Sequence, residues 1–159
     1  MDNKAYDYSI RRARFTDLTQ IIALGQAFWE EARIEKYGLG FDAEYFRRFL
    51  LNLMRNGEGT ILAALSDGMI IGGIAGVLVP WMLDANQTIM AELWWYVMPK
   101  YRGGRLALKL IKEMENEARR NKATHMSMVT QSERKETSLQ KFYERIGYHH
   151  LEHYHLRSL

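Results

Sequence analysis

Apolar and polar residues recur along this chain at two spacings, one typical of strands and one typical of helices. The clearest strand pattern spans residues 89–97, where aromatic and β-branched side chains cluster until Pro99 ends the run. A helical pattern follows a glycine-containing turn at residues 101–105. Its apolar stripe consists of Leu106, Ala107, Leu110, Ile111, Met114 and Ala118. The pattern predicts a strand, a short turn and a long amphipathic helix, around which the other elements are arranged.

The segment before this unit predicts one strand and two helices. A strand is expected over residues 8–14, followed by a helix whose apolar stripe starts at Leu18. A glycine-containing link over residues 32–40 separates it from a second helix, which Asp42 caps and Gly57 ends.

Strand patterns return after the second helix and again near the C-terminus. Asp67-Gly68 is a two-residue turn signal between strand-like runs, which predicts a hairpin. We expect strands over residues 60–65, 69–79, 126–129 and 148–156, and a helix over residues 135–145. The predicted order is β-α-α-β-β-β-α-β-α-β. Because no repeat, low-complexity segment or internal boundary interrupts residues 1–159, a single α/β domain is expected.

Composition describes an ordinary globular protein and excludes several classes of function. The chain has 159 residues, of which 47% are hydrophobic and 26% charged. It contains no apolar run long enough to span a membrane, and its first residues lack the apolar core of a signal peptide. The absence of cysteine excludes disulfides and a thiolate nucleophile, so a cytoplasmic setting is the simplest expectation.

The net charge of +3 suits an anionic ligand but is too small to indicate nucleic acid by itself. A nucleic-acid-binding protein therefore stays as one alternative, with a basic face made of Arg11, Arg12, Arg14, Arg47 and Arg48.

Cations also crowd the start of the long helix, where Lys100, Arg102, Arg105 and Lys109 lie close in sequence. A helix N-terminus already carries roughly half a positive charge, so these cations are mildly unfavourable on their own. Unpaired N–H groups beside two glycines make the turn suitable for an anion. A solvated basic turn is the alternative that the residues alone leave open.

This turn resembles a motif of a known family. Motif A of the GCN5-related N-acetyltransferases, the GNAT superfamily, follows Arg/Gln-x-x-Gly-x-Gly/Ala and cradles the pyrophosphate of acetyl-CoA. The matching run is Arg102, Gly103, Gly104, Arg105, Leu106 and Ala107. The resemblance implies a single GNAT-fold domain with a mixed, mostly antiparallel sheet flanked by helices, and acetyl-CoA as a co-substrate bound by these residues. Arg105 stands where the family usually has glycine, although its backbone N–H and its side chain can both contact phosphate.

The end of the strand over residues 89–97 also has a counterpart in the family. There the strand diverges from its neighbour, and its backbone groups pair with the pantetheine arm of the cofactor. The resemblance assigns this role to Trp95, Tyr96 and Val97. Core packing of the aromatic rings is the alternative for Trp95.

Residues 139–148 resemble the family's final motif, in which an aromatic helix ends at Gly-Tyr or Gly-Phe. The resemblance implies that Tyr143 is the general acid that protonates the departing coenzyme A thiolate, and a phenol suits that role. A packed helical tyrosine is the alternative. The resemblance also implies that Ser138 or Thr137 faces the cofactor, while Glu136 stands where the family usually has Asn.

Glu92 is an acidic residue in an otherwise apolar strand, where burial of its charge would need a reason. Strand alternation predicts that Glu92, Trp94 and Tyr96 point to one face of the sheet. Some members of the family use a glutamate near this place as general base, which implies that role for Glu92. A solvated glutamate at the beginning of the strand is the alternative.

The sequence therefore predicts an acyl-CoA-dependent N-acyltransferase, in which the primary amine of a small molecule or peptide attacks acetyl-CoA directly. A non-catalytic binding or structural module of the same fold is an alternative, because Arg105 and Glu136 depart from the family pattern. We expect no metal, because no Cys or carboxylate set accompanies the C-terminal histidines His149, His150, His153 and His155. Neither a membrane nor nucleic acid is an expected partner, and homodimer formation is left open.

Overall fold

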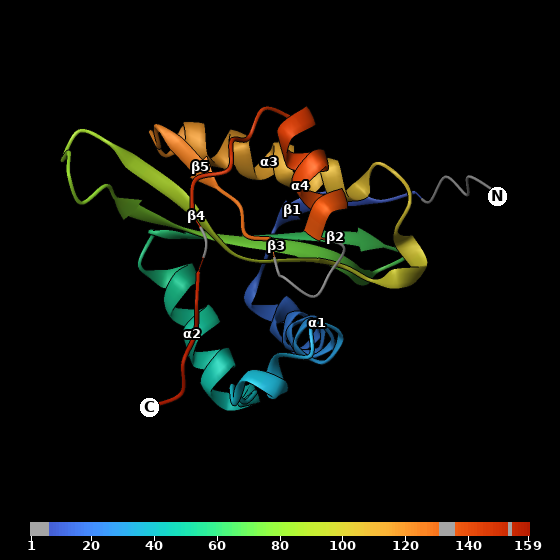
Figure 1. Cartoon of the computed structure of the whole chain (residues 1–159). Coiled ribbons are helices and arrows are strands. Elements are labelled where there is room, and N and C mark those ends of the chain that lie inside the picture. Colours follow the sequence, from blue (N-terminus) through green and yellow to red (C-terminus); the bar gives the residue numbers. More distant parts are fainter. Residues whose placement is uncertain (1–6, 131–135, 153) are drawn as a thin grey trace.

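A computed structural model describes residues 7–130, 136–152 and 154–159 of the chain (Figure 1). The strands are β1 (Ser9–Arg12), β2 (Gly59–Ser66), β3 (Met69–Pro80), β4 (Thr88–Val97) and β5 (His125–Ser127). The helices are α1 (Leu18–Glu31), α2 (Ala43–Arg55), α3 (Leu106–Arg120) and α4 (Glu136–Arg145), and short 3₁₀ turns lie between some elements. The predicted order of elements is confirmed as far as α4.

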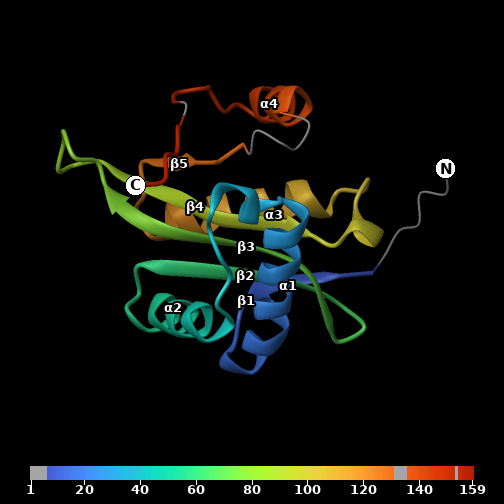
Figure 2. The ribbon, with the colours of Figure 1, turned by 60° about the horizontal axis from the view of Figure 1, so that its bottom comes forward.

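The strands form one sheet in the order β1-β2-β3-β4-β5. Neighbouring strands are antiparallel except for β4 and β5, which run parallel. Helices α1 and α2 cover one face of the sheet, and α3 and α4 cover the other (Figures 1 and 2). This mixed, mostly antiparallel sheet flanked by helices is the predicted fold class.

Two local signals in the sequence act as predicted. The carboxylate of Asp42 accepts hydrogen bonds from the backbone N–H groups of Glu44 and Tyr45, both at 2.9 Å, and so caps α2. Asp67 and Gly68 have φ angles of 49° and 76°, the left-handed conformation that a two-residue hairpin turn requires. The cap fixes the start of α2, and the turn fixes the register of the β2–β3 hairpin.

A hydrophobic core lies on each face of the sheet. Under α1 and α2 it includes Leu18, Ile21, Leu24, Leu50, Leu53, Ile61, Trp94 and Tyr96. Under α3 and α4 it includes Leu62, Ile71, Ile74, Met90, Val97, Leu110, Ile111, Met114 and Tyr143. The predicted apolar stripe of α3 therefore faces the second core, with Leu110, Ile111 and Met114 fully buried.

An extra residue in β4 changes which side chains share a face. Trp94 is opposite Ala75 in β3 and Glu92 is opposite Gly76, so Leu93 has no partner of its own and forms a β-bulge. The prediction that Glu92, Trp94 and Tyr96 share one face is therefore wrong. Trp94 and Tyr96 pack under α1 and α2, whereas Glu92 lies on the α4 side, because strand alternation does not continue through a bulge.

The predicted last strand over residues 148–156 is also wrong, since its described residues form no strand. Gly147, at φ 96°, ends α4 by donating to the Glu144 carbonyl, and the N–H of Tyr148 donates to the Tyr143 carbonyl. The Tyr148 hydroxyl then donates to Glu115 in α3 at 3.0 Å. These contacts hold Tyr148 against the helices, and β5, with three residues, offers little ladder for a further strand.

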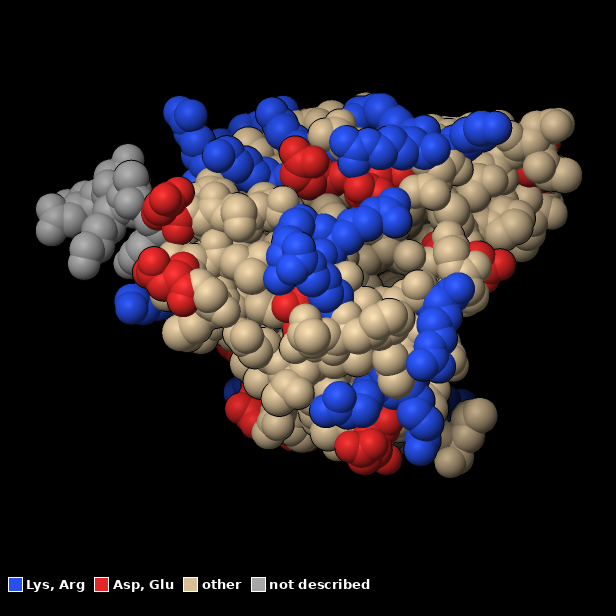
Figure 3. All heavy atoms as spheres, turned by 180° about the vertical axis from the view of Figure 1, so that it is seen from behind, with Lys and Arg blue, Asp and Glu red and all other residues tan. Residues whose placement is uncertain are grey.

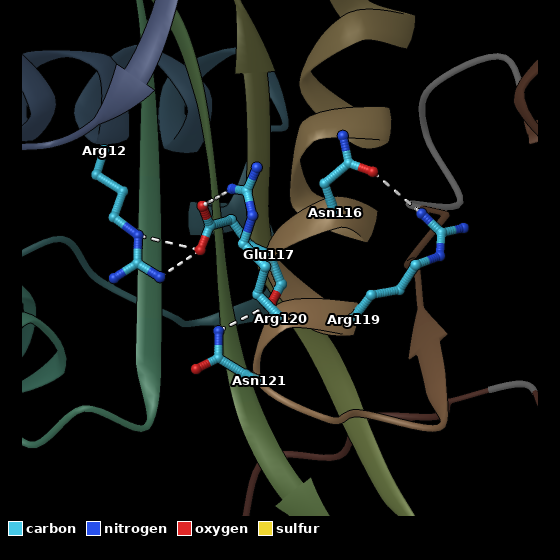
Figure 4. Close-up of polar contacts among 6 residues, drawn as sticks. All are labelled: Arg12, Asn116, Glu117, Arg119, Arg120 and Asn121. Carbon is cyan, nitrogen blue, oxygen red and sulfur yellow. Dashed lines mark hydrogen bonds and ion pairs between the residues drawn. The ribbon is translucent and has the colours of Figure 1, made fainter.

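A buried carboxylate connects β1 to α3 (Figure 4). Glu117 is 5% exposed and accepts hydrogen bonds from Arg12 in β1 and, at 2.7 Å, from Arg120 one turn further along α3. Burial by itself would raise the pKa of Glu117, but hydrogen bonds from the two guanidinium groups and their charges outweigh it, so the pKa is lowered. Arg12 thereby joins the edge strand of the sheet to the helix on its second face.

We expect Glu117→Gln to destabilise the protein in a pH-dependent way. A carboxyl with a lowered folded-state pKa stabilises the fold above its unfolded pKa of about 4.3 and loses that effect as the pH falls. The variant should lose about 1–2 kcal/mol near neutral pH, because both arginines are more than half exposed to solvent, and much less near about pH 3. Urea unfolding at both pH values measures this, with Glu113→Gln on the same helix as the control. An equal loss at both pH values would contradict it.

Candidate active site

The turn between β4 and α3 leaves open space at the start of the helix. Gly103 has a φ of 88°, which favours glycine, and α3 begins at Leu106, which is 3% exposed. A Cβ atom added to Gly104 would meet no protein atom within 4 Å. The side chain of Arg105, at the N-cap position, makes no capping hydrogen bond. An uncapped helix N-terminus beside such space is an arrangement that binds anions.

Arg102, the first residue of the predicted motif, directs its side chain to α1. Its Nη1 and Nη2 donate to the two carboxylate oxygens of Glu31 at 2.6 and 2.7 Å, and its Nε donates to the Val97 carbonyl at 2.7 Å. The guanidinium also lies 5.1 Å from the centre of the Tyr96 ring. A protein carboxylate therefore already balances the charge of Arg102, and its backbone N–H donates to the Pro99 carbonyl at 3.2 Å.

The other basic side chains around the turn stay on the surface. All three of these side chains, Lys100, Arg105 and Lys109, are exposed. The ammonium group of Lys100 lies 5.5 Å from the centre of the Tyr101 ring, and that of Lys109 lies 4.9 Å from the centre of the Tyr8 ring. Figure 3 shows Lys and Arg gathered along the side of the molecule that α3 forms, with acidic side chains among them. These cations can approach an anionic ligand without first leaving a buried site.

Strands β4 and β5 pair only over a short stretch. Ile89, Met90 and Ala91 are opposite His125, Met126 and Ser127, and the pairing stops before the bulge. In the described part of the chain, Trp95, Tyr96 and Val97 therefore have a strand neighbour in β3 but none on the β5 side. This is the geometry in which an extended ligand could add to a strand edge, although the Val97 carbonyl already accepts a hydrogen bond from Arg102.

Glu92 and Tyr143, both predicted to be catalytic, meet at one residue after β5. Oε2 of Glu92 accepts a hydrogen bond from the Val129 N–H at 2.8 Å. The hydroxyl of Tyr143 donates to the Val129 carbonyl at 3.3 Å. The bulge at Leu93 makes this convergence possible, because it places Glu92 on the α4 side of β4. The structure thus brings a carboxylate and a phenol from distant parts of the sequence to the same place.

Burial shifts the pKa values of both groups upward. Glu92 is only partly buried as a residue, but desolvation of its carboxyl raises the pKa to about 7, against the opposing effect of the Val129 N–H. Burial, followed by the nearby charge of Glu92 and by Tyr148, raises the pKa of Tyr143 above its ordinary value. Near neutral pH, Glu92 can therefore exchange a proton while Tyr143 keeps its own.

Aromatic rings form one wall of this region. The Trp95 ring stacks on Phe142 with centroids 6.3 Å apart and a 12° interplanar angle, and its centroid lies 6.1 Å from that of Tyr143. The ring centroid of Tyr148 lies 5.8 Å from that of Tyr143. The core-packing interpretation therefore holds for the ring of Trp95, and its backbone is the part that faces the gap between β4 and β5.

The remaining candidate residues lie at the edges of this region. Ser138 is exposed on α4 and borders an open hollow of about 620 Å³ with Lys141, Glu144 and Arg145, while the side chains of Glu136 and Thr137 lie outside the described part. Ala107 is half-buried and packs against the core under α3. The described residues contain no group of His, Cys, Asp or Glu that could hold a metal ion, although His153 lies outside them.

The alternative partners find little support in the structure. Within the basic face proposed for nucleic acid, Arg11 pairs with Asp17, Arg12 with Glu117 and Arg47 with Glu44. Carboxylates thus balance a large share of that face. No described helix is long and apolar enough to cross a membrane.

Sequence reasoning missed two residues of this region. Val129 was expected inside a strand, and nothing in the sequence shows that Glu92 and Tyr143 would bond to its backbone. Glu31 was part of a helix end with no assigned role, and it pairs with Arg102 although 71 positions separate them. A contact of that sequence separation leaves no signal in spacing or periodicity.

The five-strand mixed sheet flanked by helices matches the fold of GNAT acetyltransferases, and the comparison with protein families agrees. The chain belongs to the acetyltransferase (GNAT) family, whose model matches residues 23–148. None of the curated proteins matches the chain.

Solved structures share the fold at low sequence identity. The aminoglycoside N-acetyltransferase AAC(6')-Iy, in complex with the bisubstrate analogue CoA-S-monomethyl-acetylneamine, gives a TM-score of 0.78 at 17% identity, covering 96% of this chain and 98% of that one. A predicted acetyltransferase from Clostridium acetobutylicum, with acetyl-CoA, gives a TM-score of 0.74 at 14% sequence identity, and the match covers 96% of each chain. An acetyltransferase of Trypanosoma brucei gives a TM-score of 0.74 at 17% sequence identity, and the match covers 96% of this chain and 100% of that one. Identities this low support the fold and leave the substrate open.

We expect Glu92→Gln to stabilise the protein only at higher pH. A carboxyl with a raised folded-state pKa favours the fold while it is protonated, and that contribution is lost as the pH rises through about 7. The glutamine keeps an acceptor for the Val129 N–H but carries no charge. Melting temperatures of the variant and wild type should agree at about pH 4 and differ by several degrees, in favour of the variant, at about pH 8.5. A difference that does not change with pH would show that Glu92 does not titrate in this range.

Proposed function

We propose that this protein transfers the acetyl group of acetyl-CoA to a primary amine. The observation that carries the proposal is the meeting of Glu92 and Tyr143 at Val129, on the α4 side of β4, next to the strand end without a β5 neighbour. A base and an acid are the two groups that such a transfer needs, because the amine loses a proton and the thiolate gains one. The acetyl-CoA and bisubstrate complexes among the structural neighbours support the same chemistry.

The cofactor would extend from the glycine turn of motif A, before α3, to the end of β4. Its pyrophosphate would accept hydrogen bonds from backbone N–H groups of residues 103–107 at the start of α3, with Arg105 and Lys109 near its charges. The N–H of Arg102 already donates to the Pro99 carbonyl, so Arg102 would shape this site rather than donate to the phosphate. The pantetheine arm would run along Trp95, Tyr96 and Val97, where β4 lacks a β5 neighbour. Ser138 stays a prediction for cofactor contact.

The reaction would be a direct displacement at the thioester. The nitrogen lone pair of the neutral amine forms the new C–N bond at the carbonyl carbon, and the C–S bond then breaks. Glu92, with a pKa of about 7, takes the proton that the amine loses, either directly or through a water molecule. Tyr143, whose pKa is raised by burial and by Glu92, stays protonated at neutral pH and gives its proton to the departing sulfur. Holding both substrates in this geometry supplies the remaining acceleration.

The acceptor would be a small-molecule or peptide amine. The aminoglycoside N-acetyltransferase among the neighbours favours a small molecule, although the shared fold does not identify it. The non-catalytic alternative stays distinguishable: such a module would bind coenzyme A but release no thiol from acetyl-CoA with any amine.

The direct test is thiol release from acetyl-CoA with a panel of amines, run with the wild type and Tyr143→Phe. The variant keeps the ring contacts with Trp95 and Tyr148 but loses the acid, so kcat should fall roughly 10²-fold while the KM for acetyl-CoA changes little. Tyr148→Phe is the matched control, since it removes the neighbouring hydroxyl, which bonds to Glu115, and should keep most of the turnover. Wild-type kcat in Tyr143→Phe, in an assay limited by chemistry, would exclude it as the acid.

The turn makes a separate prediction about binding. Gly104→Val should weaken acetyl-CoA binding roughly tenfold or more, because the added side chain would fill the space where the pyrophosphate approaches the backbone. The melting temperature without ligand should stay close to that of the wild type, because no protein atom lies within 4 Å of the added Cβ. Arg105→Ala should cost less, since it removes a charge and keeps the backbone. Calorimetric titration with acetyl-CoA measures the affinity of the wild type and of both variants. An unchanged affinity in Gly104→Val would place the pyrophosphate elsewhere.

A further inference from the structure

A hydrogen-bonded network joins the end of α1 to the turn before α3. Glu31, the last residue of α1, accepts two hydrogen bonds from the guanidinium of Arg102 and a third from the Tyr96 hydroxyl at 2.9 Å. Arg102 is held at the same time by the Val97 carbonyl and by the face of the Tyr96 ring. A helix on one face of the sheet is thus connected to the turn that leads to the helix on the other face.

Stability alone is a poor reason for this network. The side chains of Arg102 and Glu31 are 38% and 31% exposed, and ion pairs with that exposure typically contribute roughly 0–1 kcal/mol. What a planar, two-pronged Arg–carboxylate pair supplies is direction, because both partners have fixed geometry. The network therefore determines where Arg102 lies more than how strongly the protein is folded.

The position of Arg102 matters because two glycines come directly after it. Gly103 and Gly104 have no side chains to anchor them, and glycine has the largest conformational freedom of any residue. Leu106, buried in the core under α3, fixes the chain on the far side of the two glycines. On the near side, the N–H groups of Tyr101 and Arg102 donate to the carbonyls of Met98 and Pro99, and the Arg102 side chain adds the bonds to α1 and to β4.

We propose that Glu31 is a positioning residue for acyl-CoA binding. By holding Arg102 against α1 and β4, it keeps the backbone of residues 102–105 in the conformation that receives the pyrophosphate, and Tyr96 orients the carboxylate for this task. The inference rests on the proposed function and extends it to α1, on the opposite face of the sheet from α3.

An opposite arrangement can be tested in the same experiment. Arg102 could leave Glu31 and bind the pyrophosphate directly, in which case Glu31 would compete with the cofactor. The structure favours the positioning role, because release of Arg102 would break its bond to the Val97 carbonyl as well as both bonds to Glu31. The two roles predict opposite signs for the loss of the Glu31 charge.

The experiment compares Glu31→Gln with Glu30→Gln, its neighbour on α1, which bonds to Gln26. In Glu31→Gln the dissociation constant of coenzyme A, measured by calorimetry, should rise on the order of threefold to tenfold, and the KM for acetyl-CoA should rise with it. The kcat and the melting temperature should change little, which separates positioning from general loss of structure. Tyr96→Phe should act in the same direction and should not add fully to Glu31→Gln, because both act through one carboxylate.

A second readout needs no cofactor. Amide hydrogen exchange of residues 98–105 in the unliganded protein should be faster in Glu31→Gln and unchanged in Glu30→Gln. Unchanged exchange, or tighter coenzyme A binding in Glu31→Gln, would overturn the proposal. If the wild type binds no coenzyme A at millimolar concentration, the proposed function is wrong, and the exchange rates alone then support or overturn the role of Glu31 in fixing the turn.

Discussion

The bulge at Leu93 is the constraint on which the arrangement of the site depends. One extra residue in β4 reverses the alternation of side chains along the strand. Met90 and Glu92, before the bulge, lie on the side of α3 and α4, whereas Trp94 and Tyr96, after it, pack under α1 and α2. Pairing with β5 stops at Ala91, immediately before this irregularity. A regular strand would have placed Glu92 with Trp94 on the α1 side, out of reach of Tyr143.

The same geometry explains how a carboxylate is tolerated inside this strand. Desolvation raises the pKa of Glu92 to about 7, so its charged form is costly, and the one described hydrogen bond to its carboxylate comes from the Val129 N–H. The Val129 carbonyl is in turn used by Tyr143, so the backbone of one residue connects the two side chains. A group whose ionisation is costly in the folded protein is a poor choice for stability and a suitable one for proton transfer near neutral pH.

The parts of the fold that local chemistry determines could be predicted from the sequence. The apolar stripe of α3, the Asp42 cap and the Asp67-Gly68 turn are each decided by residues close together in the chain, and all were confirmed. The bulge was not predictable, because an extra residue in one strand shows only against its partner strand. The strand expected at residues 148–156 failed because Tyr148 is held by α4 and Glu115, contacts that no alternation pattern contains. Arg102 could be placed in the turn by its motif, but its direction depends on Glu31, 71 positions away.

The charges along α3 support the proposal that its N-terminus binds an anion. At the C-terminal end, Arg119 and Arg120 agree with the helix dipole, and they bond to Asn116 and Glu117 on the same helix. The first turn contains no acidic residue, and Arg105 occupies the N-cap position without a capping bond, with Lys109 one turn further on. Cations there oppose the dipole by a few tenths of a kcal/mol each. One helix thus follows the rule for stability at its end and breaks it at its start, which supports the proposed acetyl-CoA site, because a bound anion would offset the unfavourable charges.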